Sequence, residues 1–400
     1  MRIAAINISD YGSTGKIMLG IAAEARKQGH EVITYSRKWF GQATREGHRY
    51  FGLAAEHAAH HAAGYVTGDE GSGSYISTLL LIHELERYAP DVLHLHNLHG
   101  WYLNLPLLFR YIKENSIKTV WTLHDCWAFT GHCPYFDYAE CSRWKNGCGR
   151  CPQYKMYPSS MLDNSHKMFC RKSKWFNGAA DLTLVCPSRW LAEHVKSSFL
   201  SDYAVKVIHN GIDTDTFAYR DSDFRERHGI GSDETVVLGV AFDWEKRKGI
   251  DVFSKLNDVL GDGYRTVLVG ADASACNGVP GRAVCIPKTQ DQIELAEIYS
   301  AADVFVNPSR EDNYPTVNME AISCGTPAAV FDTGGSAESV LPGCGTAVAR
   351  DDIEALADAV RQLRSEKKDR SAMHMQAVRS FDVSIMTDAY LRLLEGDMDV

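Results

Sequence analysis

The 400-residue sequence lacks two features that would tie it to a particular partner: an excess of basic residues and a long apolar run. Lys and Arg number 42 against 51 Asp and Glu, so the formal net charge is -9, whereas nucleic-acid-binding domains usually carry a basic excess. No apolar stretch approaches the roughly 18 to 20 residues that a membrane span requires. We therefore expect no nucleic-acid partner and no transmembrane helix.

An export signal is also missing from the N-terminus, where Met1-Arg2 leads directly into a short strand-like run at 3–8. This absence favours a cytoplasmic protein. The chain nevertheless contains 11 cysteines. In a reducing compartment they predict free thiols or metal ligands, and not a disulfide framework.

Neither common phosphate-binding glycine motif is complete near the N-terminus. The Rossmann pattern G-x-G-x-x-G is absent, and in the loop at 10–16 the first glycine of a P-loop is replaced by Asp10. Ile17 also stands where Ser or Thr would hold magnesium. Gly12 and Gly15 still let the backbone approach a phosphate closely, although the loop alone does not identify a site.

Short apolar runs alternate with amphipathic helical segments along the whole chain. This alternation predicts parallel sheets with helices on both faces, and 400 residues with 45% hydrophobic content predict two domains. The polar, Gly-rich stretch at 37–73 is interpreted as loops or insertions. Expected strands in the second half cover 235–241, 265–270, 283–287, 304–306 and 326–331.

The most informative stretch, 307–327, follows the expected strand at 304–306. It is interpreted as a loop and then a helix that ends at Gly325 and Pro327. Free N–H groups at such a helix N-terminus suit an anionic ligand such as a diphosphate. Asp312 and Glu320, with seven residues between them, can flank a sugar nucleotide by accepting hydrogen bonds from its hydroxyls. Solvated acids on an ordinary loop and helix are the alternative.

The stretch 308–327 resembles the E-x7-E signature of the retaining GT-B glycosyltransferases of family 4. The resemblance rests on Pro-Ser at 308–309, then an acid, seven residues, Glu-Ala at 320–321 and C-G-T-P at 324–327. One departure is Asp312, which lies in D-N-Y-P where the family usually has Glu in E-G-F-G, while Glu311 lies one place early. The resemblance implies an α/β protein of the GT-B class, with two Rossmann-like domains facing across a cleft.

The resemblance places the sugar-nucleotide donor mainly on the second half of the chain. Lys248-Gly249 matches the family's K-G, so Lys248 is expected to neutralise the diphosphate without a catalytic metal. The family's preceding Arg is missing at 241–243, and Arg247 or Lys246 is a candidate replacement. Glu320 would hold the ribose and Asp312 the sugar. The expected donor-binding residues are Gly12, Gly15, Arg247, Lys248, Asn313, Tyr314 and Glu320.

The first half is expected to supply the acceptor side. His99 and His124 each follow an expected strand, at the position where sites form in open α/β sheets. Family 4 enzymes similarly place a His after the second of these strands, so we expect His124 near the donor sugar. The catalytic set is then His124, Lys248, Asp312 and Glu320. The acceptor-side set is Asn97, His99, Asp125 and Trp127.

A cysteine-rich insert at 126–160 follows His124 almost directly. Cys148 and Cys151 have the C-x2-C spacing of half a structural zinc site, and Cys133 and Cys141 would complete an all-thiolate shell. Free or partly oxidised thiols are the alternative. A metal clamp here would hold a loop that shapes the acceptor side.

The segment 166–176 interleaves basic residues with aromatics. On a helix, this pattern fits either docking on an anionic membrane surface or lipid-diphosphate acceptor, or a solvated helix that packs its aromatics inward. The first interpretation predicts peripheral contact with the inner face of a membrane.

The expected domains are residues 1–213, with the insert at 126–160, and residues 214–382, followed by a C-terminal helix at 383–400 that crosses back to the first domain. We expect a retaining glycosyltransferase that moves a sugar from a nucleotide-diphosphate donor to a glycan or lipid-linked acceptor in polysaccharide biosynthesis. The strings at 97–99 and 124–127 and the insert resemble enzymes that build colanic-acid-like exopolysaccharides. A GT-B sugar-nucleotide epimerase and a non-catalytic sugar-nucleotide-binding scaffold are the alternatives.

Overall fold

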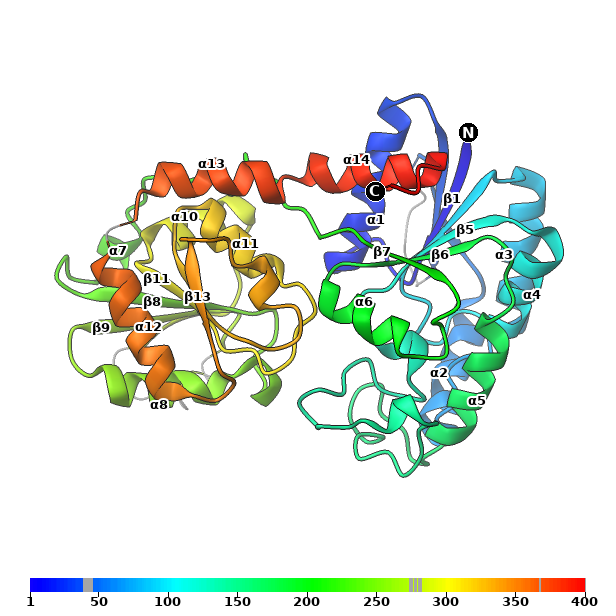
Figure 1. Ribbon diagram of the computed structural model, residues 1–400, viewed down its shortest axis with the longest axis horizontal. Helices are drawn as coiled ribbons and strands as arrows, with labels where there is room; N and C mark the ends of the chain where they lie inside the picture. Colours follow the sequence, from blue (N-terminus) through cyan, green and yellow to red (C-terminus); the bar gives the residue numbers. More distant parts are fainter. Residues whose placement is uncertain (39–45, 273–275, 277–278, 280–282, 367, 400) are drawn as a thin grey trace. The chain divides into compact units, whose positions relative to one another are not determined.

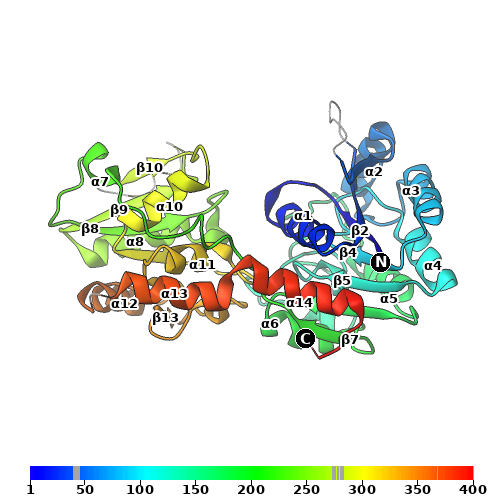
Figure 2. The same cartoon turned by 90° about the horizontal axis from the view of Figure 1, so that it is seen from above.

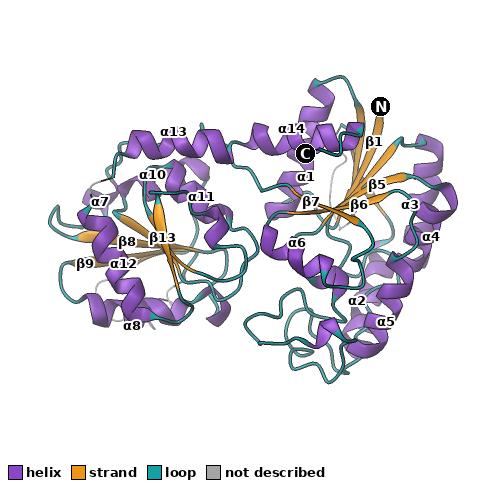
Figure 3. Ribbon diagram, viewed as in Figure 1, coloured by secondary structure: helices purple, strands orange, loops and turns teal. Residues whose placement is uncertain are grey.

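The computed structural model describes residues 1–38, 46–272, 276, 279, 283–366 and 368–399. The chain divides into two compact units: unit 1 comprises Met1–Ile208 with Thr387–Val400, and unit 2 comprises His209–Met386 (Figure 1). Each unit contains one parallel sheet with helices packed on it (Figure 3). The expected pair of Rossmann-like α/β domains is thereby confirmed.

Unit 1 is built on a seven-stranded sheet in the order β3-β2-β1-β4-β5-β6-β7. Its strands are β1 Arg2–Asn7, β2 Glu31–Arg37, β3 His48–Phe51, β4 Val92–Leu95, β5 Lys118–Thr122, β6 Leu182–Cys186 and β7 Ala204–Val207. Its helices are α1 Gly12–Lys27, α2 Ala54–Thr67, α3 Tyr75–Tyr88, α4 Leu105–Asn115, α5 Ser165–Phe176 and α6 Arg189–Lys196, with short 3-10 turns η1 Trp127–Phe129 and η2 Arg143–Lys145.

The two faces of this sheet are covered by different helices, because successive side chains of a strand point to opposite faces. Leu93 and Leu95 of β4 share a buried cluster with apolar side chains of α3 and α4. On the other face, His94 packs against Tyr390 of α14 (Val383–Glu395), with ring centroids 5.3 Å apart. Figure 2 shows α3 and α4 together at one side of unit 1, away from α14.

Unit 2 is built on a six-stranded sheet in the order β10-β9-β8-β11-β12-β13. Its strands are β8 Thr235–Val240, β9 Tyr264–Val269, β10 Val284–Ile286, β11 Val304–Asn307, β12 Ala328–Phe331 and β13 Gly345–Val348. Its helical elements are α7 Phe224–Arg227, η3 Lys246–Lys248, α8 Ile250–Leu260, α10 Gln292–Ala301, α11 Thr316–Ser323, η4 Ala337–Ser339, α12 Ile353–Ser365 and α13 Arg370–Phe381.

Two apolar clusters cover the two faces of the second sheet. Val304 and Val306 of β11 contribute to the cluster that contains α8 and α12. Phe305, between them, contributes to the cluster that contains α10, α11 and α13. This alternation along one strand explains why the run at 304–306 is apolar without interruption: a parallel sheet with both faces covered has no polar side.

Two expectations require correction. The stretch 37–73 contains β3 and α2, although we expected loops; residues 39–45 lie outside the described part of the chain. We did not predict β3 from the sequence because a four-residue edge strand is too short to show periodicity. Cys276 and Cys285 are joined in a disulfide, which the sequence analysis did not anticipate.

None of the described helices is long and apolar enough to cross a bilayer.

Acid should weaken unit 1 through His94, whose Nε2 lies 3.0 Å from Oγ1 of Thr122. Burial disfavours the charged imidazole and lowers its pKa to about 3, whereas the unfolded chain titrates near 6.5. Below pH 6.5 the unfolded state therefore binds more protons. For this group alone, the free energy of unfolding should fall by about 2 kcal/mol between pH 7 and pH 5.

Urea titrations of wild type and His94→Gln at both pH values test this expectation. Tryptophan fluorescence reports mainly on unit 1, because Trp244 is the one tryptophan in the sequence of unit 2. The variant should lose less stability on acidification than wild type. An equal loss in both proteins would contradict the role assigned to His94.

Candidate functional site

The candidate residues of unit 2 follow the two strands at which the winding of the sheet reverses. β8 pairs with β9 on one side and with β11 on the other, so chain connections from this point lead toward opposite edges of the sheet. Ligands of open α/β sheets bind outside the carboxyl ends of strands at such a point. The loop after β8 carries Lys248, and the loop after β11 carries Asp312.

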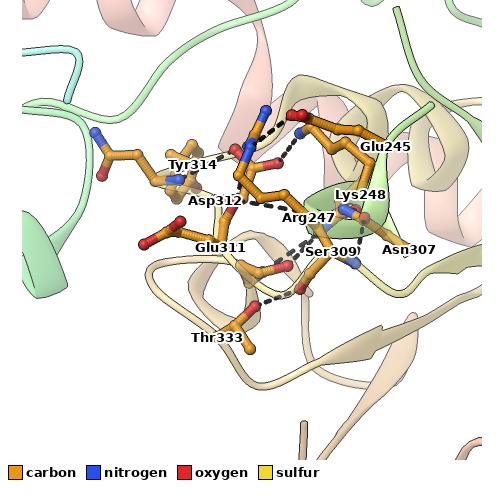
Figure 4. Close-up of polar contacts among 12 residues, drawn as sticks. Glu245, Arg247, Lys248, Asn307, Ser309, Glu311, Asp312, Tyr314 and Thr333 are labelled. Carbon is orange, nitrogen blue, oxygen red and sulfur yellow. Dashed lines mark hydrogen bonds and ion pairs between the residues drawn. The ribbon is translucent and has the colours of Figure 1, made fainter. Parts of the chain in front are cut away.

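Lys248 and Asp312 form an ion pair between these two loops, with 2.6 Å from Nζ to Oδ2 (Figure 4). The other carboxylate oxygen of Asp312 accepts a hydrogen bond from the backbone N–H of Asn313 at 3.1 Å. Both charged side chains remain partly accessible, at 24% and 16%. The pair therefore places a cation and a carboxylate side by side at the carboxyl ends of β8 and β11.

Two arginines connect the same loops in different ways. Arg247 donates from Nη1 to the carbonyl of Glu311 at 3.1 Å and from Nε to Glu245 at 2.9 Å. Arg310 is buried and forms ion pairs with Asp251 at 2.8 Å and with a second aspartate on the loop before α12. Arg310 is thus a structural clamp that the sequence analysis missed, because nothing in the sequence distinguishes it from a solvated arginine.

Close backbone packing makes glycine necessary beside both loops. A Cβ atom on Gly334 would lie 1.8 Å from the carbonyl oxygen of Asp312, and one on Gly249 would lie 2.3 Å from that of Pro308. Both glycines also have positive φ, +56° and +76°. Gly335 adds a hydrogen bond from its N–H to the Asp312 carbonyl at 3.1 Å. The Asp312 loop is therefore held by its backbone.

A buried amide network joins α11 to the strand before it. Asn318 is fully buried; its Oδ1 accepts from Asn307 at 2.8 Å, and its Nδ2 donates to Oγ of Ser339 at 2.9 Å. Thr333 completes the support by donating to the carbonyl of Ser309 at 2.6 Å. Buried polar groups satisfied in this way specify a single arrangement of the surrounding backbone.

The remaining donor-side candidates in unit 2 have partners of their own. Glu320 accepts a hydrogen bond from the hydroxyl of Tyr299, on α10, at 3.1 Å, and remains partly exposed. Tyr314 is buried and stacks on His209 with ring centroids 4.6 Å apart and planes 14° apart. Lys246, considered as a replacement for the missing arginine, is exposed, and its carbonyl accepts from Arg310.

Unit 1 brings the predicted acceptor-side residues and His124 together around one small pocket at the ends of β4 and β5. The candidates among its lining residues are Asn97, His99, His124, Asp125 and Trp127. Asp125 contacts two of the other candidates, His99 and Trp127. One of its carboxylate oxygens lies 3.0 Å from Nε2 of His99, and the second accepts from the backbone N–H of Trp127 at 2.8 Å.

Burial and charge act differently on the histidines of this pocket. Burial opposes protonation of His99, but the charge and hydrogen bond of Asp125, together with the charge of Glu70, outweigh burial and raise the pKa of His99 above 6.5. The pKa of His124 is lowered to about 4 by burial. Its Nε2 lies 3.0 Å from Nδ1 of His96, whose pKa burial also lowers. The pocket thus holds two histidines whose pKa values are shifted in opposite directions, upward for His99 and downward for His124.

The glycine loop of unit 1 adjoins this pocket through Asn7, the last residue of β1. Its side chain accepts from the N–H of Asn97 at 3.1 Å and donates to the carbonyl of Ser9 at 2.8 Å. Gly12 has a φ of +71° at the start of α1. Gly15 packs so closely that an added Cβ would lie 2.7 Å from Asp10.

Two buried ionisable side chains beneath the pocket were not predicted. Glu70 accepts from Nε1 of Trp127, and Lys172 donates to the carbonyls of Trp127 at 2.8 Å and Thr130 at 3.2 Å. Burial raises the pKa of Glu70 to about 7 and lowers that of Lys172 to about 7. They lie about a hundred residues apart in the sequence, and no motif marks either one.

Lys172 lies on α5, the helix within the basic and aromatic segment 166–176. Met168 and Phe176 of this helix are buried as well, whereas Lys167 and Lys174 are exposed. For Phe176 the structure therefore agrees with the alternative of aromatics packed inward. Membrane contact through this segment stays a prediction.

Gly334→Ala should loosen the Asp312 loop. The matched control is Gly343→Ala, at which φ is also positive, +77°, but nothing lies within 4 Å of an added Cβ. The control should cost roughly 1–2 kcal/mol of stability from backbone strain alone, and Gly334→Ala roughly 1–3 kcal/mol more from steric overlap. Calorimetric unfolding of the two variants measures the difference, and equal losses would show that the loop tolerates the extra methyl group.

Asp125→Asn should lower the pKa of His99. The substitution removes the carboxylate that favours the imidazolium and leaves burial, which disfavours it, so the pKa should move from above 6.5 to below it. NMR titration of isotopically labelled histidines measures the shift, with Asp91→Asn on the exposed surface of the same unit as the control. An unchanged pKa in Asp125→Asn would contradict the electrostatic coupling.

Comparison with known families assigns both halves of the chain. The model of Glycosyltransferase Family 4 matches residues 15–216, and that of Glycosyl transferases group 1 matches residues 221–379. WcaC of Escherichia coli (strain K12), a glycosyl transferase assigned to colanic acid biosynthesis, is 28% identical over 273 residues. That alignment covers 66% of this chain and 65% of WcaC, so the chain spans less than two thirds of this relative.

Solved structures share the fold over nearly the whole chain. Sucrose-phosphate synthase from Thermosynechococcus elongatus has a TM-score of 0.71 at 16% identity and covers 98% of both chains. Anabaena Alr3699/HepE, solved in complex with UDP-glucose, has a TM-score of 0.66 at 14% identity and covers 99% of both chains. At these identities the likeness shows the fold alone.

Proposed function

Because the chain belongs to Glycosyltransferase Family 4, we propose that it transfers a sugar, with retention of configuration, from a nucleotide-diphosphate donor to a glycan or lipid-linked acceptor in polysaccharide biosynthesis. The observation that carries this proposal is the Lys248–Asp312 pair at the carboxyl ends of two strands of unit 2. The likeness to WcaC supports the polysaccharide context. The UDP-glucose bound to the similarly folded HepE supports a nucleotide-sugar donor.

Lys248 and Asp312 divide the recognition of the donor between them. The ammonium of Lys248 neutralises the diphosphate, and Arg247, on the same short turn, adds a second cation. Asp312 accepts hydrogen bonds from hydroxyls of the transferred sugar. Its ion pair with Lys248 holds the ammonium in place before the donor arrives, so that less side-chain entropy is lost on binding.

The remaining donor contacts come from backbone and carboxylate groups. The N–H groups at the start of α11, after Asn313 and Tyr314, face the negative charge of the donor. Glu320, which accepts from the hydroxyl of Tyr299, is assigned to the ribose hydroxyls of the donor. In unit 1 the glycine loop with Gly12 and Gly15 contributes a surface on which backbone approaches the donor closely.

Retention follows if the departing diphosphate itself serves as the base. The bond between the anomeric carbon and the diphosphate oxygen breaks, and the electron pair leaves with the diphosphate, whose charge Lys248 stabilises. The acceptor hydroxyl then bonds to the anomeric carbon on the same face and gives its proton to a diphosphate oxygen. No protein nucleophile and no catalytic metal ion are required.

The pocket of unit 1 is assigned to the acceptor side. His124 is neutral at physiological pH, because burial lowers its pKa to about 4, and we assign it to contact with the sugar near the acceptor side. Asn97, His99, Asp125 and Trp127 surround it. Their hydrogen-bonding groups suit a hydroxyl-rich acceptor.

Donor binding tests the assignment directly. Isothermal titration with a panel of nucleotide sugars should find a donor that binds wild type, and Lys248→Ala should bind it 10- to 100-fold more weakly, because a charged contact contributes about 1.5–3 kcal/mol. The matched control is Lys246→Ala, which removes the neighbouring cation whose side chain is exposed. Equal weakening by both substitutions would indicate a general effect of charge and no specific role for Lys248.

Product analysis then separates the three functions. With the donor and a panel of polysaccharide or lipid-linked acceptors, wild type should form a product with the donor's anomeric configuration, and Glu320→Ala should need more donor to do so. An isomerised sugar nucleotide formed from donor alone would favour the epimerase. Binding without turnover on any acceptor would favour the scaffold.

A further inference from the structure

We propose that Cys133, Cys141, Cys148 and Cys151 bind one structural zinc ion, which fixes the cysteine-rich segment against the pocket of unit 1. These four thiols, called the cysteine cluster below, come from three separate places in the insert, yet all four line one small pocket. Cys133 and Cys151 are hydrogen-bonded to each other through their side chains. Cys148 interacts electrostatically with Cys141 and Cys151.

The backbone around Cys148 forms a tight turn. Four consecutive residues, at 147–150, have positive φ: Gly147 at +112°, Cys148 at +27°, Gly149 at +128° and Arg150 at +48°. Two of them are not glycine, so the turn carries backbone strain that surrounding interactions must offset. The N–H of Gly131 also donates to Sγ of Cys148 at 3.2 Å.

The donor set and the local charge favour zinc. Four thiolates in tetrahedral arrangement are the usual ligands of a structural zinc site, with Zn–S distances of about 2.3 Å. Four thiolates and one Zn²⁺ leave two net negative charges. Lys172 lies within electrostatic range of Cys133 and Cys148 and is fully enclosed by protein, so its ammonium would offset part of this charge.

Closing the site requires the thiol groups to move toward one another. Within the described residues, no group of three or more His, Cys, Asp or Glu side chains stands ready-made at metal-binding geometry. The cysteine cluster lies between 131 and 164, where the only regular element described is the single turn η2. Because this stretch has no sheet or long helix to oppose side-chain rotation and short backbone shifts, four convergent thiols can close on an ion.

The proposed ion would position residues of the pocket without touching a substrate. Thr130 donates to the carbonyl of Cys133 at 2.6 Å, and the N–H of Cys126 donates to the carbonyl of Pro134 at 2.9 Å. These bonds tie the first cysteine of the cluster to η1, which begins with Trp127. Loss of metal would therefore disorder the wall of the pocket formed by Trp127.

Metal content of the full-length chain, purified without a metal-binding tag, tests the proposal. Elemental analysis should find about one zinc per chain in wild type, and Cys148→Ser or Cys151→Ser should retain less than about a tenth of it. The matched control is Cys170→Ser, because Cys170 is exposed on α5 and does not line the pocket. Replacement by Co²⁺ should produce the intense visible bands of tetrahedral thiolate coordination in wild type and in Cys170→Ser.

Either of two results would overturn the proposal: wild type without zinc after growth in zinc-supplemented medium, or full zinc retained by both cluster variants. A disulfide between two cysteines of the cluster, found by mass spectrometry of the unreduced protein, would also contradict the zinc site. It would support the alternative of oxidised thiols. The readout is independent of sugar transfer. An inactive protein that contains zinc would contradict the proposed function alone.

Discussion

The ion pair between Lys248 and Asp312 depends on how tightly the loops after β8 and β11 pack. A partly exposed pair of this kind contributes only about 0–1 kcal/mol to stability, so its value to the protein lies in position. The position is determined by contacts that leave no room for a Cβ atom at Gly249 and Gly334, and by the buried Arg310 clamp. Backbone packing thus places two charges that would otherwise sample many rotamers, so the proposed donor would meet a site already organised.

In unit 1 the candidate residues are buried and polar, so their charge states depend on burial and on neighbouring charged groups. Burial alone would remove the charge from every histidine in the pocket, and Asp125 reverses this for His99 only. Below them, Glu70 and Lys172 are enclosed, each with a pKa moved toward neutrality. Such networks are stable only when their groups are satisfied, which explains why the adjoining insert needs firm anchoring of the kind proposed for the cysteine cluster.

Local sequence was sufficient for features that a few neighbouring residues control. The strand, loop and helix around Asp312 and the two α/β halves were predicted correctly, because period-two alternation, helical spacing and terminal glycines act over short distances. The edge strand β3 was missed because four residues carry too little pattern. The roles of Arg310, Glu70 and Lys172 were missed because burial depends on residues far away in the sequence, and each of them is chemically ordinary on its own.

By itself, the sequence determined the family, the succession of strands and helices, and which side chains follow the strand ends. The tertiary structure alone decided which of those side chains meet. Asp312 contacts Lys248, 64 positions away in the sequence, and His99 contacts Asp125, 26 positions away, since parallel strands carry the residues after their carboxyl ends to one edge of each sheet. The tertiary structure also decided the pKa values of the histidines, because burial and the approach of distant charged groups occur only once the chain has folded.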